Sequence, residues 1–150
     1  MDVVEIRSLG PTDLSLMQQM LGMFGAAFED PAAYDGARPD DAWLAHLLGG
    51  ETFVALAAIA EGQIVGGIAA YVLDKFEQPR REVYLYDLAV AEPWRRRGIA
   101  TALIEELKRV AKARGAYVIF VQADPGDDPA IALYTGLGRR EDVLHFDIDP

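Results

Sequence analysis

The hydrophobic pattern of the first third of the chain predicts one short strand and two helices. Residues 3–7 form the expected strand, and Thr12, just after a Gly-Pro break, is the expected N-cap of the first helix. Apolar side chains then recur at spacings of three and four, which is typical of a helix with one buried face. They are Leu14, Met17, Leu21, Phe24 and Phe28. A polar loop leads to the second helix, for which Asp40 or Asp41 is the expected N-cap and Gly49 the end.

The middle of the chain predicts three strands. Residues 52–60 and 64–73 are rich in β-branched and small apolar residues, and the Glu61-Gly62 pair between them predicts a hairpin turn. Residues 82–90 follow a charged loop and alternate between apolar and polar side chains. Val83 and Leu85 lie on one side of this strand, and Glu82, Tyr84 and Tyr86 lie on the other. We therefore expect the strand to offer a polar, aromatic face.

The last third predicts two helices and two strands. Residues 98–114 carry an apolar helical stripe, and residues 117–123 are a continuous apolar run, the pattern of a central strand covered on both faces. Asp128, followed by proline, is the expected N-cap of a further helix. Residues 143–149 are the expected last strand.

The resulting order, βααβββαβαβ, predicts a protein of the α/β class. A mixed, mostly antiparallel twisted sheet would be flanked by about four helices on its two faces. The chain has 150 residues, of which 51% are hydrophobic, so residues 1–150 are expected to form a single domain.

Charge and composition exclude several classes of function. The net charge of -10 repels the phosphates of nucleic acids and favours a polycationic partner. The chain has no cysteine, and neither His46 nor His145 lies at a metal-ligand spacing, so we expect no metal. No apolar run reaches membrane-spanning length and the N-terminus lacks a signal-peptide pattern, so a cytoplasmic protein without a membrane partner is expected.

Three consecutive arginines and a glycine stand where the strand over residues 82–90 gives way to the following helix. A helix N-terminus binds anions through unpaired backbone N–H groups and the positive end of its dipole. Arg95, Arg96 and Arg97 add positive charge there, and Gly98 allows a pyrophosphate to approach the backbone closely. The run therefore predicts a phosphate site in an otherwise acidic chain.

Three motifs in the same order resemble those of the GNAT superfamily of acyl-CoA-dependent N-acyltransferases. The signature Arg/Gln-x-x-Gly-x-Gly/Ala is met by Arg95, Gly98 and Ala100. The strand before it ends in Leu-Ala-Val at residues 88–90, and a later block over residues 130–138 contains Ala-Leu-Tyr and Leu-Gly. The resemblance implies the GNAT fold, with acetyl-CoA as co-substrate.

A closer similarity, over nearly the whole chain, is to the small GNAT-type aminoglycoside 3-N-acetyltransferases. The stretches that resemble this group are residues 75–80, 86–90, 115–119, 121–124, 126–130 and 145–150. This resemblance implies transfer of an acetyl group to the 3-amino group of an aminoglycoside antibiotic, a resistance activity, by direct attack of the amine on the thioester.

The GNAT resemblance also assigns the residues that bind CoA. It implies a pyrophosphate site formed by Arg95, Arg96, Arg97, Gly98, Ile99, Ala100 and Thr101. The pantetheine arm would pair like an added strand with Leu88, Ala89 and Val90, where a backbone N–H polarises the thioester carbonyl. Tyr134 stands at the position of the family's general acid, which protonates the departing thiolate and contacts the cofactor.

Three residues are candidates for activating the amine, directly or through a water: Asp87, Glu82 and Tyr86. Asp87 is favoured because a carboxylate at the inner end of an apolar strand is costly unless it has a partner or a function. A β-bulge that this family carries in its fourth strand would re-aim Asp87.

Acidic residues are concentrated after Gly115, where seven carboxylates stand against two arginines. Because aminoglycosides carry several ammonium groups, a carboxylate-lined cleft would steer and orient them. Asp124 and Asp127 are the expected substrate-binding acids, together with Glu82, Tyr84 and Tyr86. Asp127 also stands where many GNAT proteins have an asparagine against the pantetheine arm, so its role is divided between cofactor and substrate.

Two rival functions stay open at this level. An N-acetyltransferase of polyamines or other small amines would use the same acidic cleft, and a non-catalytic module that senses acetyl-CoA would keep the phosphate loop alone. A homodimer is expected, because the last strand, over residues 143–149, would lie at a sheet edge and pair with a second copy.

Overall fold

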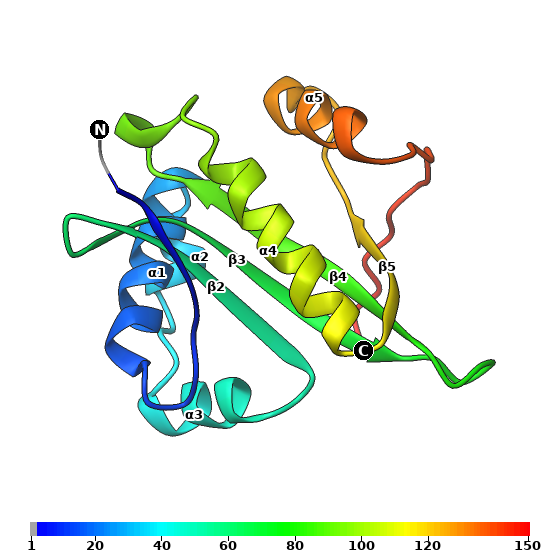
Figure 1. Ribbon diagram of the computed structural model, residues 1–150, viewed down its shortest axis with the longest axis horizontal. Helices are drawn as coiled ribbons and strands as arrows, with labels where there is room; N and C mark the ends of the chain where they lie inside the picture. The colour runs from blue at the N-terminus through cyan, green and yellow to red at the C-terminus, as the bar shows by residue number, and fades with distance from the viewer. Residues whose placement is uncertain (1–2) are drawn as a thin grey trace.

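The computed structural model describes residues 3–150 and is built on a five-stranded sheet in the order β1-β2-β3-β4-β5. The strands are β1 (Glu5–Ser8), β2 (Phe53–Ala60), β3 (Gln63–Asp74), β4 (Arg81–Val90) and β5 (Ala116–Val121). Neighbouring strands are antiparallel except β4 and β5, which are parallel. The predicted mixed, mostly antiparallel α/β architecture is therefore confirmed (Figure 1).

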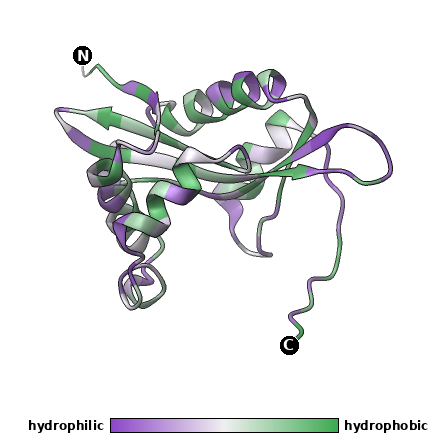
Figure 2. Ribbon diagram, turned by 90° about the horizontal axis from the view of Figure 1, so that it is seen from below, coloured by the Kyte–Doolittle hydropathy of each residue, from purple (hydrophilic) through white to green (hydrophobic). Residues whose placement is uncertain are grey.

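Helices pack on both faces of the sheet, which Figure 2 shows edge-on. One face is covered by α1 (Leu14–Ala27) with α2 (Pro31–Asp35) and α3 (Asp41–Gly49), and the other by α4 (Ile99–Ala113). A short 3-10 helix, η1 (Glu92–Trp94), joins β4 to α4, and α5 (Asp128–Leu137) follows β5.

Strand β2 shows why both faces need a cover. Its residues Val54, Leu56 and Ala58 are buried in the core beneath α4, whereas Phe53, Ala55 and Ala57 are buried in the core beneath α1 and α3. Side chains alternate along a strand, so a strand that is apolar at every position must be covered on both sides.

The hairpin between β2 and β3 is confirmed. Glu61 and Gly62 have φ of 53° and 74°, the left-handed conformation that a tight hairpin turn of this kind requires at both central positions. The two strands pair antiparallel on either side of this turn.

The helices near the N-terminus differ from expectation in two places. Asp13, not Thr12, is the N-cap of α1, and the loop expected before the second predicted helix contains the additional helix α2. Asp30 begins α2 by accepting a hydrogen bond from the backbone of the first turn. Asp40 caps α3 in the same way, as predicted.

Three predictions for the last third are wrong. Residues 143–149 form no strand but belong to an exposed tail without secondary structure, because no neighbouring strand supplies their backbone hydrogen bonds. The strand β5 is the edge of the described sheet and is only partly buried, where a central strand was expected. Asp127, not Asp128, caps α5, with its carboxylate 3.4 Å from the Ala130 nitrogen.

Within residues 3–150, no helix combines the length and the hydropathy needed to cross a membrane.

Candidate active site

The parallel strands β4 and β5 diverge halfway along β4. Their pairing ends with Leu85 opposite Val121, the last residue of β5, whereas β4 continues to Val90. A cleft of about 300 Å³ opens at this point. It is lined by Phe28, Tyr34, Tyr86, Asp87, Leu88, Val121, Gln122, Ala123, Asp124, Asp127, Ala130 and Tyr134. The divergence thus brings together side chains of β4, β5, α5 and the end of α1.

A β-bulge sets the direction of the side chains where the strands diverge. Ala69 of β3 pairs with Asp87 and Ala70 pairs with Leu85, so Tyr86 is an extra residue on β4. Leu85 is buried in the core, whereas Asp87 lines the cleft. The bulge expected from the GNAT resemblance is therefore present at the expected place.

Asp87 and Tyr34 form a hydrogen-bonded pair in the cleft. The Tyr34 hydroxyl donates to Asp87 Oδ2 over 2.8 Å. Burial raises the pKa of the Asp87 carboxyl, and the hydrogen bond from Tyr34 partly offsets that rise. A carboxylate with a raised pKa is a stronger base than an ordinary surface aspartate, which suits Asp87 to accept a proton from an amine.

Aromatic packing holds the Tyr34 side chain in place. Its ring centroid lies 6.0 Å from that of Phe24, which is buried, and 5.7 Å from that of Phe28. A Cβ at Gly25 would lie 3.2 Å from the Tyr34 Cβ, so the glycine permits α2 to approach α1. Burial and the Asp87 contact raise the pKa of Tyr34, so its hydroxyl stays a donor at neutral pH.

Tyr134 enters the same cleft from α5 and is half-buried. Burial, followed by the nearby charge of Asp127, raises the pKa of Tyr134 to about 12. The hydroxyl is therefore protonated throughout the neutral range, as a proton donor to a departing thiolate must be.

The aromatic and acidic candidates on β4 differ in their distance from the cleft, because they lie at different positions along the strand. Tyr86 lines the cleft, and Tyr84 lies beside it, with its hydroxyl donating to Gln122 Oε1 over 2.9 Å. Glu82 lies outside the cleft lining, where its carboxylate accepts a hydrogen bond from the Tyr117 hydroxyl. Of the three candidate bases, Asp87 and Tyr86 therefore line the cleft, whereas Glu82 does not.

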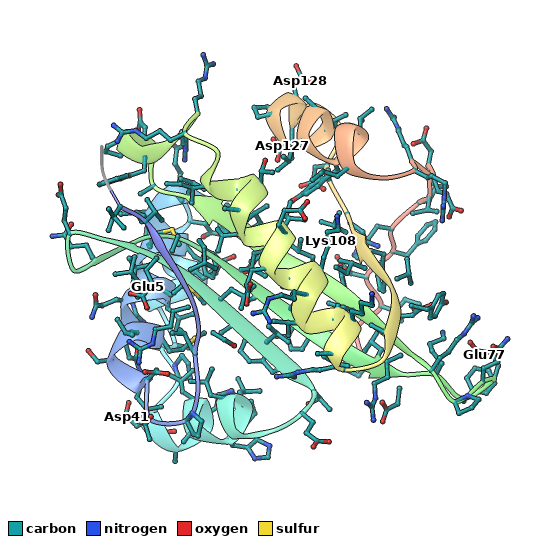
Figure 3. The ribbon with its side chains drawn as sticks, viewed as in Figure 1. Glu5, Asp41, Glu77, Lys108, Asp127 and Asp128 are labelled. Atoms are coloured by element: carbon teal, nitrogen blue, oxygen red, sulfur yellow. The ribbon has the colours of Figure 1, made fainter. Side chains whose placement is uncertain are left out.

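Of the acidic residues after Gly115, Asp124 and Asp127 line the cleft. Figure 3 shows Asp127 on the side of α5 that faces α4, whereas Asp128 points outward from the start of the helix. The remaining late acids belong to the exposed tail. The acidic character of the cleft therefore rests on two residues of the β5–α5 loop together with Asp87.

The predicted phosphate loop has the backbone geometry of an anion site. Arg96 and Gly98 both have left-handed backbone, with φ of 61° and 78°. The first hydrogen bond of α4 runs from the Ala102 nitrogen to the Gly98 oxygen at 3.0 Å, and no side chain caps the helix. The N–H groups of the first turn, which are those of Ile99, Ala100 and Thr101, are therefore without a partner inside the helix.

Two of the arginines also organise the loop itself. Arg95 Nε donates to the Val90 carbonyl over 3.0 Å, which ties the loop to the end of β4. The Arg97 guanidinium lies over the Trp94 ring, 4.8 Å from its centroid. Arg96 is exposed on the same loop.

The end of β4 has a backbone edge next to this loop that no strand of the described sheet pairs with. Leu88, Ala89 and Val90 pair with β3 on one side, and β5 has already ended on the other. An extended ligand can therefore pair with this segment as an added strand would.

Sequence reasoning did not assign six residues of the cleft lining to the site: Phe28, Tyr34, Val121, Gln122, Ala123 and Ala130. Tyr34 lies in a segment that the sequence predicts to be a loop, and Phe28 belongs to the predicted buried stripe of the first helix. Gln122 directly follows the last residue of β5, and the polar side chain at the end of this apolar strand could have indicated that it lines the cleft.

Comparisons with known proteins agree with this geometry. The model of the acetyltransferase (GNAT) family matches residues 16–138. The solved structure of HMB0005, an aminoglycoside acetyltransferase from an uncultured soil metagenomic sample, is 57% identical, covers 99% of each chain and superposes with a TM-score of 0.96. The solved structure of meta-AAC0020, an aminoglycoside acetyltransferase from an uncultured soil metagenomic sample, in complex with sisomicin, is 33% identical and covers 98% of this chain and 96% of that chain, with a TM-score of 0.90.

A curated relative is more distant. The N-acetyltransferase family 8 member 2 of Rattus norvegicus is 31% identical over 85 residues, which are 57% of this chain and 38% of that protein. The chain thus matches well under half of the length of this relative. With the family model matching residues 16–138 and the divergent strands, the β-bulge and the arginine-glycine loop present, the chain belongs to the GNAT family of acetyltransferases.

Proposed function

We propose that the protein transfers the acetyl group of acetyl-CoA to the 3-amino group of an aminoglycoside. The observation that carries this proposal is the cleft between β4 and β5, which holds Asp87 and Tyr134 next to a free strand edge. The similarity to HMB0005, an aminoglycoside acetyltransferase, over 99% of the chain supports the acceptor class.

The donor would bind along the end of β4 and the start of α4. Its pyrophosphate would lie on the free N–H groups of the first turn of α4, with Arg95, Arg96 and Arg97 nearby. The pantetheine arm would pair with the free edge of residues 88–90, and a backbone N–H there would polarise the thioester carbonyl. Loss of one such oxyanion donor typically costs about 3–4 kcal/mol of barrier.

The chemical step needs one proton acceptor and one proton donor. Asp87 would take a proton from the acceptor's ammonium group, either directly or through a water, and leave the amine free to attack. The C–N bond forms as the C–S bond breaks, and Tyr134 would donate its hydroxyl proton to the departing thiolate. The second proton of the attacking nitrogen would pass through water to the Tyr134 phenolate, and Asp87 would release its proton to solvent, which leaves a neutral amide and restores both side chains. Tyr34 would act as a positioning residue, since it reaches the reaction only through its hydrogen bond to Asp87.

The acceptor would be held by charge. Asp87, Asp124 and Asp127 line one cleft, and several ammonium groups on one molecule can pair with them together. The sisomicin complex of meta-AAC0020 supports an acceptor of this kind. The assignment to the 3-amino group rests on the resemblance to the 3-N-acetyltransferase group over residues 75–150.

A polyamine is the second candidate acceptor, because the same three carboxylates would also pair with a linear polycation. The test is a panel of gentamicin-type aminoglycosides and spermidine, with release of free CoA thiol as the readout. Aminoglycosides are expected to give kcat/KM at least about 10-fold above spermidine, a difference of about 1.4 kcal/mol. A higher kcat/KM for spermidine would contradict the proposal and support a polyamine acceptor. CoA binding without turnover of any acceptor would indicate a non-catalytic sensor of acetyl-CoA.

A further inference from the structure

Gln122 is held at the edge of the cleft by a side chain of the neighbouring strand. It directly follows Val121, where the pairing of β5 with β4 ends, so no strand pairing fixes its position. The Tyr84 hydroxyl reaches it from β4 and donates to Gln122 Oε1 over 2.9 Å. A side-chain hydrogen bond thus bridges the two strands where they diverge.

The Tyr84 side chain is itself fixed by aromatic packing. Tyr84 pairs with Phe120 across the two strands, and their rings stack with centroids 4.6 Å apart and planes at 16°. The Tyr86 ring meets the Tyr84 ring edge to face, with centroids 5.5 Å apart. Burial raises the pKa of Tyr84, so its hydroxyl keeps its proton and stays a donor at neutral pH.

The hydrogen bond from Tyr84 determines which end of the Gln122 amide can contact a ligand. Because Oε1 accepts the hydroxyl proton, Nε2 is the end that is left for the cleft. Within residues 3–150, no other group forms a hydrogen bond with this nitrogen. An amide NH₂ group donates hydrogen bonds, so it can pair with an oxygen of a ligand but not with an ammonium group.

This property distinguishes Gln122 from the other polar groups of the cleft. Ionised Asp87, Asp124 and Asp127 only accept hydrogen bonds, so they pair with ammonium groups. Tyrosine hydroxyls can both donate and accept. Among the described residues that line the cleft, Gln122 has the only amide side chain. The lining therefore combines carboxylates for ammonium groups with an N–H donor for an uncharged oxygen.

We propose that Gln122 selects amine substrates that carry hydroxyl or ether oxygens beside their amino groups, and that Tyr84 positions its amide. The substrate class is an amino sugar or another polyhydroxylated amine, as opposed to a linear polyamine, which has no oxygen. This inference rests on the proposed acetyl transfer and adds a determinant of substrate choice to the three carboxylates.

The first test compares Gln122→Met with the wild type in steady-state acetylation of a gentamicin-type aminoglycoside and of spermidine. Methionine keeps the length of glutamine but has no N–H group. The ratio of the two kcat/KM values, aminoglycoside over spermidine, should fall by about 3- to 10-fold, the effect of one neutral hydrogen bond. The kcat/KM for spermidine should stay unchanged. An unchanged ratio would overturn the role of Gln122.

Gln122→Glu tests which end of the amide faces the substrate. The new carboxylate can still accept the hydrogen bond from Tyr84, but it has no N–H group and adds a negative charge. The kcat/KM for spermidine should therefore rise, and the ratio should fall by a factor similar to that in Gln122→Met. A ratio at or above the wild-type value would contradict the proposed orientation, because a carboxylate would replace an inward-facing amide oxygen without loss.

The matched control is Gln78→Glu, which makes the same change at an exposed position in the β3–β4 loop. This loop lies at the opposite end of β4 from the cleft, and Figure 3 labels the neighbouring Glu77. The control should leave the ratio unchanged. An equal fall in Gln78→Glu would assign the effect to net charge and overturn the role of Gln122.

Tyr84→Phe distinguishes positioning from direct contact. If Tyr84 acts only through the Gln122 amide, Tyr84→Phe lowers the ratio in the wild-type background and has no effect in the Gln122→Met background. Equal losses in both backgrounds would contradict the positioning role.

Failure of this inference differs from failure of the proposed function. A wild type that prefers the aminoglycoside, with a ratio that Gln122→Met leaves unchanged, would overturn only the role of Gln122. A wild type with the higher kcat/KM for spermidine would overturn the proposed acceptor class and the role of Gln122 with it.

Discussion

Gly98→Ala is expected to weaken CoA binding by about 5- to 30-fold through backbone strain alone. Gly98 has φ of 78° at the start of α4, and no other atom lies within 4 Å of a Cβ added there. An L-residue in this left-handed conformation costs roughly 1–2 kcal/mol, and the loop can relax when no ligand is bound. CoA would then have to restore the strained conformation, which reduces its affinity by the corresponding factor.

The measurement is isothermal titration of CoA, with thermal unfolding measured in parallel. Gly62→Ala is the matched control, because Gly62 has φ of 74° and is equally free of neighbours, but it lies in the β2–β3 turn. Gly62→Ala should lower the stability and leave CoA affinity unchanged, because the paired strands hold the turn in its left-handed conformation, whereas Gly98→Ala should lose CoA affinity with a smaller loss of stability in the ligand-free chain. Gly98→Asn should lie between the wild type and Gly98→Ala, since asparagine tolerates left-handed backbone better. Unchanged CoA affinity in Gly98→Ala would refute the assignment of the phosphate site to this turn.

Three further predictions concern the cleft. Tyr134→Phe should lower kcat by about 10²- to 10⁴-fold with little change in CoA affinity, measured by steady-state kinetics and titration. Tyr34→Phe should lower kcat/KM by roughly 10-fold and move the acidic limb of its pH profile to higher pH, because the Tyr34 hydrogen bond lowers the pKa of Asp87 and its loss raises that pKa. Tyr117→Phe should leave that limb in place. Asp87→Asn should raise Tm at pH 7, because the raised pKa of Asp87 means that its charged form destabilises the folded chain. This increase in Tm should vanish below about pH 4, where Asp87 is protonated in both the folded and the unfolded chain.

Much of the fold follows from local pattern. The β2–β3 hairpin needed only a turn pair between two apolar runs, and α4 needed only a strong amphipathic stripe with a glycine before it. The phosphate site at the start of α4 stays a prediction, which rests on the unpaired N–H groups of a helix start and the adjacent arginines. The position of Asp87 in the cleft was predictable, because a carboxylate in an apolar strand is costly unless it has a partner or a function.

The remaining features depend on contacts between distant segments. Tyr34 lies 53 positions before Asp87, and its helix α2 is too short to show a period in the sequence. The segment over residues 143–149 has the alternation of a strand, but no neighbour in its own chain is positioned to pair with it. Asp127 and Asp128 are both good N-caps, and only the backbone of the loop decides between them.

The proposed reaction depends on Asp87, which would accept the proton from an aminoglycoside amine in the cleft between β4 and β5. Its most direct test is the rate of acetyl transfer from acetyl-CoA to a gentamicin-type acceptor by wild type and Asp87→Asn, with the product nitrogen located by NMR. We expect acetylation of the 3-amino group by the wild type and, for Asp87→Asn, a rate about 10²- to 10⁴-fold lower with unchanged CoA affinity. A wild-type rate in Asp87→Asn would contradict this role for Asp87, and acetylation at another nitrogen would contradict the proposed position of transfer.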